Sequence, residues 1–72
     1  MKTYKNPKII TLPNDEYAIR YGYIFHRYLI PAFPAYSGID DLIDVSKEEL
    51  REVSGFVLYE EVFECFNDLM NR

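Results

Sequence analysis

The chain has 72 residues, of which 49% are hydrophobic and 17% aromatic, and its formal net charge is −4. This length predicts a single domain, residues 1–72, with a thin margin of stability. The 7 Tyr and 5 Phe side chains supply area for a core, because each buries roughly 150–250 Å². The single cysteine excludes an internal disulfide, and without a Cys/His cluster we expect no structural zinc and no other cofactor.

The sequence also bears on the cellular compartment. Its N-terminus lacks the charged and then apolar pattern of a signal peptide. No apolar run approaches the ~20 residues that a membrane helix needs, because Arg27, Pro31 and Pro34 interrupt the longest candidates. We therefore expect a cytoplasmic protein that does not enter a membrane.

Charge is distributed unevenly along the chain. Residues 1–36 contain five Lys or Arg and two Asp or Glu, a net charge of +3, whereas residues 37–72 contain three and ten, a net charge of −7. Such an asymmetry carries information about binding partners rather than about the fold. The first half is basic and aromatic, and the second half is acidic.

The first half predicts antiparallel strands. Residues 8–12 are rich in β-branched side chains, and Pro13-Asn14-Asp15 has the composition of a turn. After this turn the side chains alternate, which predicts one inward face with these apolar members: Tyr17, Ile19, Tyr21, Tyr23 and Phe25. Gly22 leaves two alternatives, a hairpin between strands 16–20 and 23–30 or a bulge in one long strand. The usual strand length of 3–10 residues favours the hairpin.

The segment between the sheet and the last helix predicts a short turn and a short helix. Pro31 to Pro34 ends the sheet, and Asp40 to Ile43 is expected to form one helical turn. Ser46 and Glu49 form a capping box that predicts a helix over residues 47–53. Gly55 is expected to end it in the left-handed conformation. Residues 56–58 are either a strand that joins the sheet, which we prefer, or the start of the next helix.

The C-terminal segment has the clearest helical pattern. Apolar residues recur at the spacing of one helical face in Tyr59, Val62, Phe63, Phe66, Leu69 and Met70. The predicted fold class is therefore α+β. A small antiparallel sheet over residues 8–30, with 56–58 added, is covered on its aromatic face by an amphipathic helix 59–71.

The two predicted helices raise the question of nucleic-acid recognition. Residues 46–55 followed by Val62 to Leu69 resemble a helix-turn-helix over about a third of the chain. Arg51 stands where that motif usually has a small residue, and the turn after Gly55 is one residue too long. A recognition helix approaches phosphates with Lys or Arg, whereas helix 59–71 carries Glu60, Glu61, Glu64 and Asp68. We therefore expect no reading of nucleic acid by this helix.

The sequence offers little for catalysis. Cys65 lies in the apolar stripe and His26 among polar strand residues, so a buried thiol and a solvated imidazole are expected rather than a nucleophile–base pair. The Asp40, Asp41 and Asp44 carboxylates lack the spacing of a calcium-binding EF-hand loop. We expect neither an enzyme nor a metal site.

The acidic side chains of the second half are the main candidates for function. Glu60, Glu64 and Asp68 stack at i, i+4 and i+8, where like charges oppose the helix. Solubility explains such a face in general, but a larger protein with a basic surface would explain the stacking as well. The predicted protein-binding residues are Asp40, Asp41, Asp44, Glu48, Glu60, Glu61, Glu64 and Asp68.

In size and composition the chain resembles phage-encoded accessory proteins, including anti-CRISPR and other anti-defence inhibitors. This resemblance implies an inhibitor that covers a nucleic-acid-binding surface of a host protein. It rests on no family motif, so it assigns no role to any residue. The alternative function is a nucleic-acid-binding module that stacks bases on strands 17–30 with Arg20, Tyr21, Tyr23, Arg27 and Tyr28. A homodimer paired through strand edges stays open as well.

Overall fold

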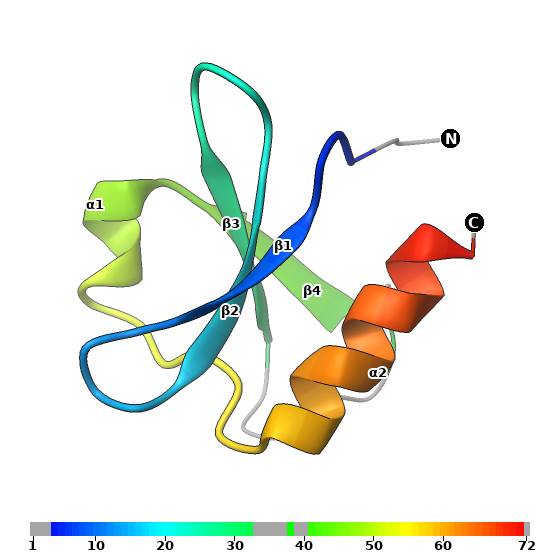
Figure 1. The fold of residues 1–72 in the computed structure, drawn as a ribbon. Helices are drawn as coiled ribbons and strands as arrows, with labels where there is room; N and C mark the ends of the chain where they lie inside the picture. The colour runs from blue at the N-terminus through cyan, green and yellow to red at the C-terminus, as the bar shows by residue number, and fades with distance from the viewer. Residues whose placement is uncertain (1–3, 33–37, 39–40, 72) are drawn as a thin grey trace.

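The computed structural model describes residues 4–32, 38 and 41–71, and it has an α+β fold (Figure 1). The strands are β1 (Lys8–Thr11), β2 (Tyr17–Tyr21), β3 (Arg27–Pro31) and β4 (Leu42–Val45), and the helices are α1 (Lys47–Leu50) and α2 (Tyr59–Met70). The strands form a 4-stranded antiparallel sheet in the order β1-β2-β3-β4. The predicted fold class, with its small antiparallel sheet and C-terminal helix, is confirmed.

The hairpin between β2 and β3 confirms the preferred reading of Gly22, although its loop is longer than expected. Gly22 has a φ of 98°, and a Cβ there would lie 2.7 Å from the Phe25 carbonyl oxygen. The chain therefore leaves the sheet at Gly22 and re-enters it only at Arg27. The predicted inward positions of Tyr23 and Phe25 are wrong, because both residues lie in this loop and Phe25 is 87% exposed.

The helical turn expected over Asp40 to Ile43 is wrong for Leu42 and Ile43, although Asp41 has the 3₁₀ conformation and its N–H donates to the Gly38 carbonyl at 3.1 Å. Leu42 and Ile43 belong to β4, where they pair with Pro31 and Ile30 of β3. The alternating, β-branched pattern of β4 suits a strand, and pairing with β3 satisfies its backbone in a way that an isolated turn would not. Asp40 lies outside the described residues.

The sheet is apolar on both faces. On one face the buried residues are Leu12, Ala18, Tyr28, Ile30 and Val45, with Leu50 of α1 packed against them. On the other face they are Ile19, Leu29, Phe56, Val62 and Cys65. The α1 helix contacts β3 and β4, whereas α2 contacts β1 and β2. Figure 1 shows the two helices on opposite sides of the sheet, so they do not form a helix-turn-helix.

The capping box of α1 is confirmed. The Ser46 hydroxyl accepts a hydrogen bond from the Glu49 N–H, and the Ser46 N–H donates to the Glu49 carboxylate at 3.2 Å. The helix ends at Leu50, earlier than predicted. The left-handed cap expected at Gly55 is wrong, since the described glycines with positive φ are Gly22 and Gly38.

Residues 51–58, called the crossing segment below, carry the chain from the α1 side of the sheet to the α2 side. The Gly55 N–H donates to the Glu16 carboxylate at 2.9 Å. Phe56 and Tyr17 exchange both backbone hydrogen bonds, at 2.7 and 2.8 Å. The strand preferred for residues 56–58 is thus reduced to one isolated bridge between Tyr17 and Phe56.

Candidate protein-binding surface

The apolar stripe of α2 is wider than the area with which the helix touches the sheet. Val62 and Cys65 are fully buried, as expected for Cys65. In contrast, Tyr59 is 52% exposed, Phe63 is 48% exposed and Met70 is 58% exposed. At 100° per residue these three side chains lie on one flank of the helix, beside its buried centre. The predicted inward face is therefore right at its centre and wrong along this flank.

The exposed flank carries two aromatic rings that pack on each other. The rings of Tyr59 and Phe63 are stacked, with centroids 6.2 Å apart. Tyr17 of β2 meets Tyr59 edge-on at 5.4 Å. Because Tyr59 is braced against the sheet, the pair is presented in a defined orientation. We call Tyr59, Phe63 and Met70 the aromatic ridge.

An acidic row runs along the adjacent flank of α2. Glu60, Glu64 and Asp68 are all exposed. Within the described part of the chain, neither Glu60 nor Glu64 forms an ion pair. The helix dipole favours Glu60 in the first turn, but it does not favour Glu64 in the middle or Asp68 near the C-terminus. The aromatic ridge and this acidic row together form the α2 outer surface.

The structure separates the other predicted acidic residues from this row. Glu61 is half-buried on α2, and Glu48 lies on α1 across the sheet. Asp41 is exposed just before β4. Asp44 accepts hydrogen bonds from the Tyr21 hydroxyl and from Arg27 Nε, the latter at 2.9 Å. The predicted acidic set is therefore not one surface, and its compact part belongs to α2.

Asp44 is the centre of a cluster that ties three strands together. It joins β4 to Tyr21 of β2 and to Arg27 of β3. The Tyr4 ring meets the Tyr21 ring edge-on at 4.8 Å, so the N-terminal segment is attached as well. Burial, and then the hydrogen bond to Asp44, raises the pKa of Tyr21 to about 12. These contacts assign Asp44 a structural role at the base of the β2–β3 hairpin.

Alkaline pH is expected to weaken the fold through Tyr21. Its pKa is raised from 10.0 to about 12 in the folded chain. The neutral phenol therefore stabilises the fold fully below the unfolded value, and this contribution disappears as the pH rises through that interval. Tyr21→Phe should reduce the alkaline loss of stability, measured by urea unfolding on either side of the unfolded pKa. A tyrosinate absorbance titration of both proteins identifies the step that belongs to Tyr21. The prediction fails if the step that Tyr21→Phe removes has the ordinary tyrosine pKa of 10.0.

The residues of the alternative function do not share one surface. Tyr21 packs on the α2 side of the sheet, whereas Tyr28 is buried on the α1 side. Arg27 is paired with Asp44. Tyr23 is exposed in the β2–β3 loop, and Arg20 faces the same side as Tyr28, its partner across the strands. The strands therefore do not present these rings as a continuous platform for bases.

Comparison with known proteins gives no family for this chain: no family model, no curated protein and no solved structure matches it. Among residues 4–32, 38 and 41–71, no group of three or more His, Cys, Asp or Glu side chains could hold a metal ion. Neither described helix has the length and apolar content needed to cross a membrane.

The aromatic ridge was missed at the level of sequence because the whole apolar stripe was assigned to the core. A helical wheel would have separated Val62 and Cys65 from the ridge, since Tyr59 and Phe63 are rotated away from them. The apolar stripe covers more of the helix circumference than packing on one sheet can bury. The width of the stripe therefore predicted that some of its residues would be exposed.

Proposed function

We propose that this chain is a non-enzymatic interaction module whose α2 outer surface binds a basic surface of a larger protein. The observation that carries the proposal is the exposed pair of Tyr59 and Phe63 beside Glu60 and Glu64. Aromatic residues and Met are enriched in protein interfaces. Carboxylates at the rim steer a basic partner and set the orientation of binding.

A role in solubility explains the acidic row of the α2 outer surface but not the aromatic ridge. Exposed carboxylates help a protein to stay in solution, but the exposed rings of Tyr59 and Phe63 oppose that effect. Their stacking also lowers the conformational entropy that these two side chains would lose when a partner packs against them. An interface explains both halves of the α2 outer surface together.

The mechanism is the occupation of an anion-binding site by carboxylates. A partner that normally binds phosphates would meet Glu60, Glu64 and Asp68 in their place, and the attraction would weaken as salt rises. In this proposal the chain acts in the cytoplasm as an inhibitor of anti-defence type. Size and composition support that part of the proposal, together with the acidic row.

The test compares two variants that change the net charge equally. Glu60→Lys/Glu64→Lys reverses the acidic row, whereas Glu48→Lys/Glu52→Lys reverses two exposed carboxylates on α1 and just after it. The tagged chain is incubated in native-host lysate at low salt, and the captured protein is quantified by mass spectrometry. We expect the α2 variant to lose at least about tenfold in affinity, equivalent to about 1.4 kcal/mol. The α1 variant should retain capture.

Phe63→Ser extends the test to the aromatic ridge. Because Phe63 is about half exposed, this change should leave the fold intact and weaken capture by at least about tenfold, as truncation of an aromatic anchor does. Equal losses in the α1 and α2 charge variants would show that only net charge matters. Capture that survives both α2 changes would refute the proposed surface.

A further inference from the structure

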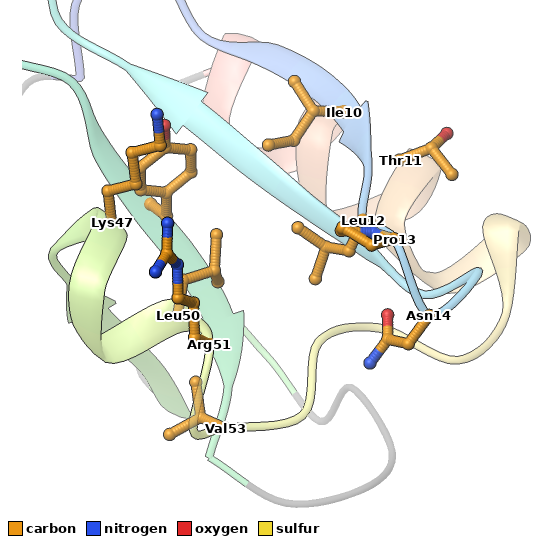
Figure 2. A pocket seen from close by; sticks show the side chains of 10 residues that line it. Ile10, Thr11, Leu12, Pro13, Asn14, Lys47, Leu50, Arg51 and Val53 are labelled. Atoms are coloured by element: carbon orange, nitrogen blue, oxygen red, sulfur yellow. The ribbon is translucent and has the colours of Figure 1, made fainter.

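A groove lies on the α1 side of the sheet, away from the α2 outer surface. It has a volume of about 570 Å³, within the range of about 300–1,000 Å³ that is typical of ligand sites. Figure 2 shows Ile10 and Leu12 on the β1 side, and Lys47, Leu50 and Arg51 on the α1 side. The groove exists because α1 is short and makes its main contacts with β3 and β4, so the helix covers the β1 edge of this face less fully.

The floor and walls of the groove are mostly apolar. Leu12 and Tyr28 are buried at its base. Ile10, Leu50 and Val53 are only partly covered and form its sides. A ligand with aliphatic or aromatic side chains would therefore remove apolar surface from water when it enters.

The polar edge of the groove is cationic. Lys47 and Arg51 line it from consecutive turns of the α1 region. Although the chain contains 12 Asp and Glu residues in total, none is among the 10 described residues that line the groove. An anionic ligand would therefore meet no repulsion from the lining residues.

A second cationic pair adjoins the groove on the same face. Lys8 of β1 stands directly opposite Arg20 of β2, and Arg20 stands opposite Tyr28. Residues directly opposite one another project from the same face, and like charges in that position are unfavourable. In the region that the structure describes, Lys8, Arg20, Lys47 and Arg51 form no ion pair. An anionic ligand would relieve the repulsion between Lys8 and Arg20.

We propose that this groove binds an acidic amphipathic peptide segment of a partner protein. Its apolar side chains would lie against the partly exposed Ile10, Leu50 and Val53, above the base formed by Leu12 and Tyr28. Its carboxylates would meet Lys47 and Arg51, with Lys8 and Arg20 at the Tyr28 end. A peptide fits better than a nucleic acid, because bases need exposed aromatic faces and the aromatic ring in the groove, Tyr28, is buried. The site is independent of the α2 outer surface.

The binding test uses two fluorescein-labelled synthetic peptides composed of Leu and Glu. One has Leu at helical spacing and the other alternates Leu with Glu as an extended strand would. We expect at least one peptide to bind the full chain in fluorescence anisotropy, with an affinity that falls as salt rises. Lys47→Glu and Arg51→Glu should each raise Kd by about tenfold, because each reversal replaces attraction by repulsion.

Lys5→Glu is the matched control, since Lys5 is exposed and does not line the groove. It changes the net charge as Lys47→Glu does, and it should alter Kd by less than about twofold. The same peptides with Lys in place of Glu should not bind. Each variant should keep its fold, because the substituted side chains are exposed. Circular dichroism of each variant checks this.

Four results would overturn the proposal. The first is that neither acidic peptide binds, and the second is that Lys47→Glu and Lys5→Glu weaken binding equally. The third is that a single-stranded oligonucleotide binds, that Lys47→Glu and Arg51→Glu weaken its binding, and that the peptides do not bind. This result would assign the groove to nucleic acid. The fourth is concentration-dependent self-association that Lys47→Glu abolishes without any peptide binding, which would make a second copy the occupant.

Discussion

Phe56→Ala is expected to lower the free energy of unfolding by about 3–5 kcal/mol, the usual cost of removing a buried Phe side chain. Phe56 has no exposed surface and packs with Ile19, Leu29, Val62 and Cys65. It therefore fills the space between the sheet and α2. A chain of 72 residues has a total stability of roughly 4–11 kcal/mol at the usual values per residue, so this single change removes much of it.

The measurement is urea unfolding followed by circular dichroism, with Phe25→Ala as the matched control. Phe25 is 87% exposed at the tip of the β2–β3 hairpin, so the same substitution should change stability by less than about 0.5 kcal/mol there. Similar losses in the two variants would contradict the packing described for Phe56. Because Phe56 holds α2 on the sheet, its loss should also abolish capture of a partner by the α2 outer surface.

Local signals in the sequence were sufficient for much of the fold. The Pro13-Asn14-Asp15 turn, the alternation in β2 and the Ser46–Glu49 capping box each act within a few residues, so they are legible without tertiary structure. The same holds for the centre of α2, where Val62 and Cys65 follow helical spacing.

Elements decided by distant contacts could not be predicted in this way. Leu42 and Ile43 are strand residues because β3 offers them a partner edge, and four residues carry too little periodicity to show this in advance. Tyr28 and Ile30 make the second face of the sheet apolar. A single alternating strand, read alone, predicts only one covered face.

The two candidate sites also differ in whether local sequence or distant contacts bring their residues together. The acidic row of α2 is visible in the sequence because Glu60, Glu64 and Asp68 share one helix. The cationic groove was not visible, because its charges come from β1, β2 and the α1 region and meet only through strand register and packing. The net charges of the two halves of the chain did not indicate the groove either, because Lys47 and Arg51 belong to the strongly acidic second half.

The α2 outer surface and the groove thus lie on opposite sides of one thin sheet and carry opposite charges. The α2 outer surface is acidic and aromatic, whereas the groove beside α1 is cationic and apolar. The two surfaces are connected through the crossing segment, whose Gly55 and Phe56 are both buried. A chain with this arrangement could hold a basic and an acidic segment at once, so the two binding tests should give independent results.

Gly55→Ala is expected to destabilise the fold at the point where the chain crosses between these sides. A Cβ at Gly55 would overlap the Tyr17 carbonyl oxygen and lie 3.0 Å from Leu12 Cδ1. Overpacking of this kind costs about 1–3 kcal/mol. The lower entropy of the unfolded chain offsets only about 0.4–1 kcal/mol of that cost. The obstacle is steric, because Gly55 is not among the glycines with positive φ.

The neighbouring Ser54→Ala is the control, since Ser54 is exposed and its substitution should change stability by less than about 0.5 kcal/mol. Urea unfolding of both variants measures the difference. Hydrogen exchange of the Phe56 and Tyr17 amides gives a second measurement, because each donates to the other's carbonyl across the bridge. Faster exchange of both amides in Gly55→Ala, with β3 and β4 unchanged, would locate the damage at the crossing segment. Unaltered stability and exchange would show that Tyr17 and Gly55 do not approach as closely as described.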